Sequence, residues 1–338
     1  MSIPISMKTS EYPKVSFIIP VLNEENTIGK CLDSLLELDY PTDKIEILTA
    51  MGKSTDNTDK IVKKYAEKHK NIVILKNPQG NTSVGRNICI EHSTGDMLMN
   101  YSGHAIAERN LLKILALKLS KLPDEIVSVG CSNISPEKQN FVGKLAGVVF
   151  SSFMGGKNLF VQNAEFDEEC FSDHISFACY RKKPVEKVGN FDPEFWCGQD
   201  AELDLRLLKA GYKILYTPKT KTYHYKRSTV KSLFRQMYRY GIARAKMVKK
   251  HPKTLKIFHL IGPGFITSIV LFVILTIFKV IPIWIIPFLS LLYVLLGIIS
   301  SLWVTTNPVL VFSSILFYLL VHVGYGLGFI RGIFYGKL

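Results

Sequence analysis

The last third of the sequence contains no acidic residue. All 28 Asp and Glu residues of the 338-residue chain lie before residue 226, where 28 Lys and Arg residues balance them. The other 14 Lys and Arg residues, and with them the whole net charge of +14, lie in residues 226–338. A basic excess spread over the chain would favour nucleic acid. A neutral region followed by a basic, apolar one instead favours an anionic membrane surface as partner, and no nucleic acid.

The sequence also lacks paired cysteines and a secretory leader. Its six Cys residues are scattered without a C-x-x-C pair. This argues against a disulfide framework and against a zinc site, and it suits a reducing compartment. The N-terminal residues are polar and contain no apolar signal-peptide core.

Short apolar runs alternate with helix-length segments over the neutral part of the chain. Strands are predicted at residues 15–21, 45–49, 72–75, 96–100 and 126–130. This alternation indicates a parallel, doubly wound α/β sheet, in which ligands bind beyond the carboxyl ends of the strands. The loops at those ends are residues 22–26, 50–56, 80–87 and 101–105. Topology alone therefore favours a nucleotide site, although a fold does not fix a function.

Residues 191–216, FDPEFWCGQDAELDLRLLKAGYKILY, combine a turn, a helix and a short strand. Asp200, Glu202 and Asp204 lie at the start of the helix, where the helix dipole stabilises negative charge. On these residues alone, a surface charge cluster is the commoner explanation. The alternative is that Asp200 faces a cleft and takes a proton from a substrate hydroxyl.

Residues 226–256 contain eleven Lys and Arg residues and no acid. Lys231, Arg235 and Arg239 recur every four residues beside an apolar face. This pattern predicts an amphipathic helix in the headgroup region of an anionic membrane, with a solvated basic helix as the alternative.

Residues 257–338 contain three apolar segments, roughly 257–278, 281–303 and 308–330, each long enough to span a bilayer. The adjoining basic residues place the large first region in the cytoplasm by the positive-inside rule. Three spans would leave Arg331 and Lys337 outside, which fits that rule poorly. A re-entrant second segment would remove the conflict, so the span count stays open. Transport is not favoured, because the segments contain no intramembrane acid and no repeat.

Five motifs in order resemble one enzyme family. They are VSFIIPVLNEENTIGKCLDSLL, STDNT, GRN, a motif at residues 102–104, and GNFDPEFWCGQDAELDLRLLKAGYKI. Together they resemble family 2 glycosyltransferases of the GT-A fold, and most of all the membrane-anchored branch similar to succinoglycan biosynthesis protein ExoA. The resemblance implies inverting transfer of a sugar from a nucleotide-diphosphate sugar, in polysaccharide or glycoconjugate synthesis. It implies a cytoplasmic GT-A domain at residues 1–225, interfacial helices at 226–256 and a membrane domain at 257–338. The protein would be a multi-pass protein of the cytoplasmic membrane.

The resemblance also assigns residues to a donor side and an acceptor side. Asp200 matches the catalytic aspartate, with Gln in place of the Glu that usually precedes it. The motif Q-x-x-R-Y comprises Gln236, Arg239 and Tyr240. The resemblance implies that it contacts the diphosphate and a membrane-presented, polyprenyl-linked acceptor. A polyprenyl phosphate acceptor would need no base, and Asp200 would then have another role. The donor nucleotide and its phosphates are implied at Pro20, Asn23, Glu24, Arg86 and Asn87.

Two positions on the donor side depart from the family pattern. Where the family carries a base-reading Asp, this sequence has AMGK, which includes Met51 and Lys53. Where the family carries a metal-binding D-x-D or D-x-H, it has Ser102-Gly103-His104. His224 resembles a further metal-ligating position. The resemblance thus implies a weakened site for a divalent metal (Mn or Mg) at His104 and His224, with imidazole favouring the transition metal.

Positioned cations offer an alternative to the metal. Lys53, Arg86 and Arg239 could neutralise the diphosphate without it. The two departures also favour a second hypothesis, a catalytically impaired pseudo-glycosyltransferase that acts as a membrane-bound binding or scaffold protein.

Overall fold

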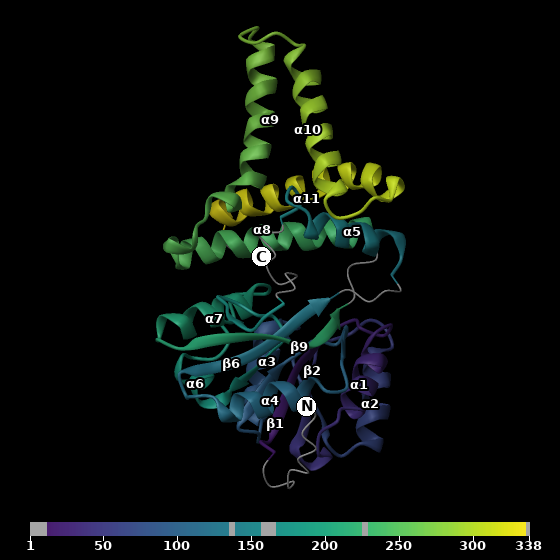
Figure 1. The fold of residues 1–338 in the computed structure, drawn as a ribbon, viewed down its shortest axis with the longest axis vertical. Helices are drawn as coiled ribbons and strands as arrows, with labels where there is room; N and C mark the ends of the chain where they lie inside the picture. Colours follow the sequence, from purple (N-terminus) through teal and green to yellow (C-terminus); the bar gives the residue numbers. More distant parts are fainter. Residues whose placement is uncertain (1–11, 135–138, 157–166, 225–228, 336–338) are drawn as a thin grey trace. The chain divides into compact units, whose positions relative to one another are not determined.

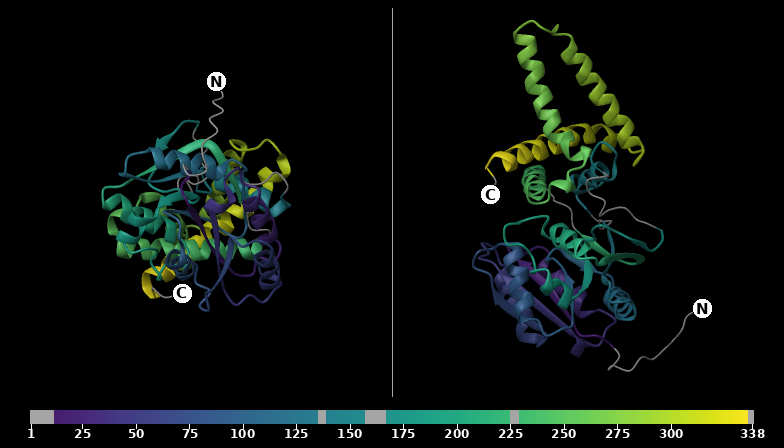
Figure 2. Two further views of the ribbon diagram at one scale, coloured as in Figure 1. Left: turned by 90° about the horizontal axis from the view of Figure 1, so that it is seen from below. Right: turned by 90° about the vertical axis from the view of Figure 1, so that its left-hand side faces the viewer.

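The structure is a computed structural model, and it describes residues 12–134, 139–156, 167–224 and 229–335. Its residues form two compact units (Figures 1 and 2). The sheet unit comprises Met1–Ile134 and Glu165–His224, and the helical unit comprises Ser135–Ala164 and Tyr225–Leu338. Nothing in the sequence pattern indicated that residues 135–164 group with the C-terminal segment.

Parallel strands make up the first half of the sheet, as predicted. They are β1 (Val15–Val21), β2 (Ile45–Met51), β3 (Ile72–Lys76) and β4 (Met97–Asn100), in the order β3-β2-β1-β4. The connecting helices are α1 (Ile28–Leu36), α2 (Thr58–Lys68) and α3 (Thr82–His92). The carboxyl ends of β1, β2 and β4 therefore meet at one edge of the sheet, where the predicted donor loops begin.

The second half of the sheet is mixed, so an all-parallel sheet was wrong beyond β4. β8 runs antiparallel to both β4 and β6, while β6 and β9 run parallel to each other. Two short strands, β5 and β7, pair antiparallel with β9. The apolar pattern of a strand is the same in either direction, so the sequence does not reveal this reversal. The remaining elements of the unit are β5 (Ala105–Ala107), α4 (Leu111–Lys121), β6 (Ile126–Ile134), β7 (Cys170–Phe171), β8 (Ala178–Arg181), α6 (Lys182–Lys187), α7 (Gln199–Lys209) and β9 (Lys213–His224).

Apolar cores cover both faces of the sheet. Alternate residues of β1 point to opposite sides, so that Phe17 and Ile19 join the core that includes α1 and α4. Ile18, between them, joins the core that includes α3 and α7. Burial on both faces explains why β1 is a continuous apolar run rather than an alternating one. The predicted fold class, an α/β doubly wound sheet followed by apolar C-terminal helices, is confirmed.

The helical unit contains three helices long and apolar enough to cross a membrane, as predicted. These spans are Ile257–Ile277, Ile285–Leu302 and Pro308–Tyr335. α9 and α10 run in opposite directions as a hairpin, and α11 lies across its base along α8 (Figures 1 and 2). The helices of this unit are α5 (Phe141–Ser151), α8 (Val230–Lys250), α9 (Ile261–Ile277), α10 (Ile285–Leu302) and α11 (Pro308–Tyr335).

Glycines bring α8 and α11 into close contact. Gly324, Gly328 and Gly332 lie every four residues on α11 and face α8. A Cβ at Gly328 would collide with the carbonyl oxygen of Tyr238, and one at Gly241 of α8 would collide with that of Tyr325. Rows of small residues permit such backbone approach between helices.

Polar side chains join residues 139–156 to the rest of the helical unit. The Tyr318 hydroxyl donates to Ser152 Oγ at 2.8 Å, and His322 Nε2 lies 2.9 Å from the carbonyl oxygen of Met154. Ser300 Oγ accepts a hydrogen bond from the Met154 N–H at 2.9 Å. These contacts explain why α5 belongs with the C-terminal helices.

Candidate active site

The loops after β1 and β2 are joined by hydrogen bonds. Asn23 adopts a positive φ, a conformation that Asn tolerates better than most residues. Its Oδ1 accepts from the Thr55 N–H at 2.8 Å, and the Glu24 N–H donates to Thr58 Oγ1 at 2.7 Å. Residues 23–24 and 54–58 therefore form one rim at the carboxyl edge of the sheet.

Two histidines and a carboxylate lie beside this rim. His104 Nδ1 is 2.8 Å from Glu24 Oε1. The ring of His224 lies 4.6 Å from that of His104, because β5 and β9 pair antiparallel with Ala105 opposite His224. A carboxylate on one ring nitrogen is the usual way to orient a metal-ligating histidine. His104 Nε2 and His224 thus fit part of a metal site, although the described residues contain no group of three or more His, Cys, Asp or Glu arranged for one.

Arg86 is a buried cation on α3. Only 6% of it is exposed, and its guanidinium lies 5.1 Å from the centre of the Phe191 ring. Burial lowers the pKa of Arg86, and attraction to Asp200 opposes that shift. An Arg keeps its charge even so. Its Nε and Nη1 have no hydrogen-bond partner among the described residues. A buried guanidinium with unused donors suits an anionic group.

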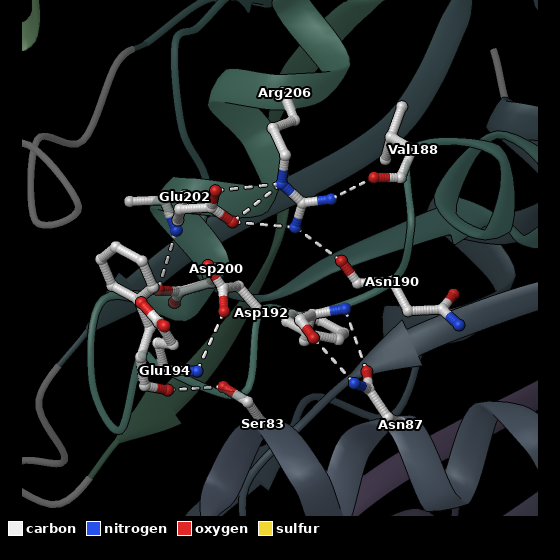
Figure 3. Close-up of polar contacts among 12 residues, drawn as sticks. Ser83, Asn87, Val188, Asn190, Asp192, Glu194, Asp200, Glu202 and Arg206 are labelled. Atoms are coloured by element: carbon white, nitrogen blue, oxygen red, sulfur yellow. Dashed lines mark hydrogen bonds and ion pairs between the residues drawn. The ribbon is translucent and has the colours of Figure 1, made fainter. Parts of the chain in front are cut away.

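Asn87, the next residue of α3 and labelled in Figure 3, makes two hydrogen bonds to the backbone of Phe191. Its Nδ2 donates to the Phe191 carbonyl oxygen at 2.7 Å, and its Oδ1 accepts from the Phe191 N–H at 2.9 Å. Ser83 Oγ donates to the Phe195 carbonyl oxygen at 2.5 Å. α3 therefore holds the segment that leads into α7, a role the sequence did not suggest for Asn87.

A buried ion pair fixes the start of α7 (Figure 3). Glu202 is fully buried, and its Oε2 lies 2.8 Å from Arg206 Nη2. Arg206 also donates to the carbonyl oxygens of Val188 and Asn190, at 2.5 and 2.6 Å. The two ends of the loop before α7 are thus tied to α3 and to α7 itself.

Asp200 lies in the first turn of α7, with 17% of its side chain exposed. Its Oδ1 accepts from the Ala201 N–H at 3.0 Å, and its Oδ2 lies 3.8 Å from His174 Nε2. The other nitrogen of His174, Nδ1, lies 2.6 Å from Asp204 Oδ2. The Tyr180 hydroxyl donates to Asp204 Oδ1 at 2.8 Å. Burial raises the pKa of Asp204, and the contact with His174 opposes that shift.

A family model describes most of the sheet unit. Residues 16–189 match the model "Glycosyl transferase family 2", and residues 115–325 match "Glycosyl transferase family group 2". The chain belongs to glycosyl transferase family 2. It is therefore a glycosyltransferase, and the resemblance seen in its motifs is confirmed.

Relatives of this family 2 chain share its length and its fold. It is 31% identical over 328 residues to a Methanococcus voltae protein, dolichyl N-acetyl-alpha-D-glucosaminyl phosphate 3-beta-D-2,3-diacetamido-2,3-dideoxy-beta-D-glucuronosyltransferase, covering 94% of this chain and 98% of that protein. It is 28% identical over 246 residues to succinoglycan biosynthesis protein ExoA of Rhizobium meliloti, covering 69% and 70%. Among solved structures, a Pyrobaculum calidifontis mannosyltransferase in complex with GDP-Man and Mn²⁺ matches with a TM-score of 0.65. That match covers 98% of this chain and 90% of the other at 16% identity, which shows the shared fold.

The other residues predicted for this glycosyltransferase lie in three places. Pro20 and Met51 occupy the ends of β1 and β2, and Lys53 is exposed just beyond β2. The Ser102 hydroxyl is buried after β4 without a partner among the described residues. In the helical unit, α8 carries the Q-x-x-R-Y motif: Gln236 Nε2 donates to the Tyr240 hydroxyl at 3.1 Å, and Arg239 is exposed.

Sequence reasoning missed His174 and gave Asp204 no role of its own. One signal was present: Asp200 and Asp204 are four residues apart, so they share one face of α7. His174 lies in the loop between β7 and β8, and no periodicity connects it to α7.

Proposed function

We propose that this family 2 enzyme is an inverting glycosyltransferase, anchored in the cytoplasmic membrane, that acts on a polyprenyl-linked acceptor. The observation that carries the proposal is the exposure of Asp200. Among the three carboxylates in the first half of α7, Glu202 and Asp204 are buried and bound to cationic or polar partners, whereas Asp200 is partly exposed. Lipid-linked acceptors are supported by the Methanococcus voltae relative, whose name specifies a dolichyl-linked substrate.

Asp200 would remove the proton from an acceptor hydroxyl. The electron pair left on the acceptor oxygen forms the bond to the anomeric carbon, from the side opposite the donor diphosphate. The bond between that carbon and the diphosphate oxygen breaks, and the nucleoside diphosphate leaves with the electron pair. The configuration at the anomeric carbon is therefore inverted, and Asp200 keeps the proton at this stage.

The charge that develops on the leaving diphosphate needs positive partners. Arg86 has unused donors, and Lys53 is exposed on the rim; both are our candidates for this role. His104 and His224 would hold a divalent cation together with diphosphate oxygens, and that cation would add Lewis-acid neutralisation of the diphosphate. Pro20, Asn23, Glu24, Met51, Asn87 and Ser102 are proposed to shape the donor side.

The helical unit would present the acceptor at the membrane. Its apolar helices are suited to anchoring, and α8 carries seven Lys and Arg residues and no acid. Such a helix favours an anionic lipid surface, and a cytoplasmic location for it and for the sheet unit is supported by the positive-inside rule. Gln236, Arg239 and Tyr240 on α8 are proposed to contact the acceptor and the diphosphate, the role that their motif implies.

One observation favours a second candidate, a non-catalytic scaffold that keeps the fold. The donor side has Ser102 and Met51 at the positions where family members carry carboxylates, so metal and base recognition would both be weakened. Such a scaffold would turn over no donor with any cation.

The test uses the full chain in detergent, with UDP-, GDP- and dTDP-sugars, Mn²⁺ or Mg²⁺, and a polyprenyl-linked acceptor. We expect transfer with one donor, and loss of about 10²–10⁴-fold in kcat for Asp200→Asn, the range for a lost general base. Asp124→Asn, at a side chain that is 99% exposed, is the matched control and should leave kcat unchanged. Absence of transfer and of nucleotide binding under every condition would support the scaffold instead.

A further inference from the structure

His174 connects two carboxylates of α7 that have different surroundings. Asp204 is fully buried and faces Nδ1, whereas Asp200 is partly exposed and faces Nε2. The charged and titratable groups around them include the Tyr180 hydroxyl from β8, which bonds Asp204, and the Arg86 guanidinium from α3, which is attracted to Asp200. Nothing in the reaction described above requires a histidine here.

The short contact with Asp204 fixes the tautomer of the ring. The carboxylate lies 2.6 Å from Nδ1 and accepts a hydrogen bond, so Nδ1 carries the proton in the neutral ring. Nε2, which faces Asp200, is then the nitrogen without a proton. Burial raises the pKa of Tyr180, so its hydroxyl stays neutral and donates to Asp204. Asp204 and Tyr180 together therefore hold the ring in one orientation and one protonation pattern.

We propose that His174 is the positioning residue of Asp200 and receives the proton that Asp200 removes from the acceptor. The inference rests on the proposed function of Asp200. Protonated Asp200 passes its proton to His174 Nε2, which leaves an imidazolium between two carboxylates and returns Asp200 to its charged form. The separation of 3.8 Å between Asp200 Oδ2 and His174 Nε2 is longer than a hydrogen bond. The two side chains must therefore approach by about 1 Å, as catalytic contacts commonly do when substrate binds.

Two substitutions separate this role from a purely structural one. His174→Asn places an amide near the position of Nδ1, so it keeps a donor for Asp204 and loses the group that faces Asp200. His174→Gln places a neutral amide near the position of Nε2, where it can orient Asp200 but cannot take up a proton at neutral pH. Neither variant removes Asp200 or a group assigned to donor binding.

The pH profile gives the distinguishing measurement. In the wild type, kcat should fall toward low pH when the His174 ring becomes protonated, because the Asp200–His174 pair can then accept no further proton. We call this part of the profile the acid limb. In both variants Asp200 lacks the histidine that shares its proton, so the limb should move to lower pH by about one unit or more. We expect kcat on the plateau to fall about tenfold and the donor KM to stay within about twofold. Wild-type kcat and an unmoved limb in His174→Asn would show that His174 is only structural.

A second measurement does not depend on turnover. The full chain with ¹³C-labelled histidine is titrated in detergent, and His174→Gln identifies the signal of His174. Asp200→Asn removes one of the two facing carboxylates and should move the titration of His174 to lower pH. An unchanged titration would overturn the inference whether or not transfer is seen. A shifted titration without any sugar transfer would support the interaction between Asp200 and His174 but refute the proposed function.

A different observation concerns the face of α11 that turns away from α8. Its apolar side chains recur every three or four residues, or at multiples of that spacing, and are 40% to 75% exposed. They are Val309, Phe312, Leu316, Leu319, Leu327 and Phe334. The opposite face of the same helix is buried and contains the glycines that contact α8. α11 therefore has one face against a basic helix and exposed apolar side chains from its first turn to its last, with a break between Leu319 and Leu327.

From this arrangement we infer that α11 lies in the membrane interface and that only α9 and α10 cross. α8 carries seven cationic side chains and cannot enter the hydrocarbon, because they would lose their hydration there. α11 is packed along α8 from Gly324 to Gly332, so it stays at the same depth, with its exposed row in the acyl boundary. Two crossings bring the C-terminus back to the side on which α9 begins. Arg331 then satisfies the positive-inside rule, which three spans would violate.

The test compares two positions of the full chain in membranes. Val280→Cys lies between α9 and α10, and an epitope is appended after Leu338; Cys170→Ser and Cys197→Ser remove the two partly exposed native thiols. A membrane-impermeant maleimide should label residue 280 in intact cells, and the epitope should be cleaved by protease only in inside-out vesicles. Cleavage of the epitope from outside intact cells would establish a third crossing and overturn the inference. Neither result depends on enzymatic activity.

Discussion

α7 of the sheet unit and α8 of the helical unit are held in place by different forces. α7 is held by charge, through the buried Glu202–Arg206 pair and the contact of Asp204 with His174. α8 is held by close backbone packing, through glycines that admit α11. Breaking a buried ion pair is strongly destabilising, because the remaining charge is left without its partner. Glycine contacts use dispersion and need no partner charge, which suits a unit built of apolar helices.

The largest expected effect follows from breaking the charge pair of α7. Glu202→Gln leaves Arg206, of which only 18% is exposed, without its carboxylate, and we expect a loss of about 3 kcal/mol in the free energy of unfolding. Glu125→Gln is the matched control, because its pair with Lys213 is about half exposed and should contribute less than about 1 kcal/mol. Thermal unfolding of the full chain in detergent measures both. Equal shifts in the two variants would contradict the role given to burial.

The corresponding change on α8 is Gly241→Ala. Its new Cβ would meet the backbone of Tyr325, which cannot move aside as a side chain could, so we expect a loss of about 3 kcal/mol. Gly264→Ala on α9 is the control, since a Cβ there meets nothing within 4 Å, and it should be neutral. The same thermal measurement applies. A neutral Gly241→Ala would mean that α8 and α11 are not packed this closely.

Substitutions of Asn87 test how far the segment before α7 depends on single polar contacts. Asn87→Ala removes both bonds to Phe191, at about 1 kcal/mol each. Asn87→Asp also loses the donor and sets a carboxylate oxygen against the Phe191 carbonyl oxygen, so it should destabilise the chain at least as much. We expect the melting temperature to fall in both variants, and kcat to fall more than the donor KM rises. A raised donor KM with unchanged kcat would instead support the nucleotide contact that the motif implied.

The smallest expected effect is at the start of α8. Thr229 and Ser232 form a capping box, and Thr229→Ala should cost about 1 kcal/mol. Thr229→Ser keeps the hydroxyl and should restore the melting temperature. Gly241→Ala should have the larger effect of the two, because its Cβ would collide with the backbone of Tyr325, whereas Thr229→Ala removes only a cap.

Much of the fold could be predicted because its local signals agree. The uninterrupted apolar run of β1 indicated a strand buried on both faces, and the three C-terminal segments had the length of membrane spans. The direction of β8 and the grouping of α5 with the C-terminal helices could not be predicted. Both depend on contacts between segments far apart in the sequence, which leave no periodic pattern.

Candidate site residues could be named where a motif is contiguous, and not where the contacts are assembled by folding. Asp200 could be singled out, because the helix and its flanking turn lie in one stretch of sequence. The contact of His174 with Asp204 joins that helix to the loop between β7 and β8, and no local pattern records it. Asn87 was recognised as part of a motif, but its two bonds to Phe191 span 104 residues, and the motif does not reveal this structural role.

The pairing of α8 with α11 also fixes an order of events during synthesis. α8 ends at Lys250 and leaves the ribosome well before α11, which begins at Pro308, and the two hairpin helices are made between them. The backbone of α8 that carries Arg239 therefore acquires its packing partner only after both hairpin helices have been made. A chain that ends before Pro308 would lack the glycine contacts of α11, so the packing of α8 depends on the last helix to be synthesised.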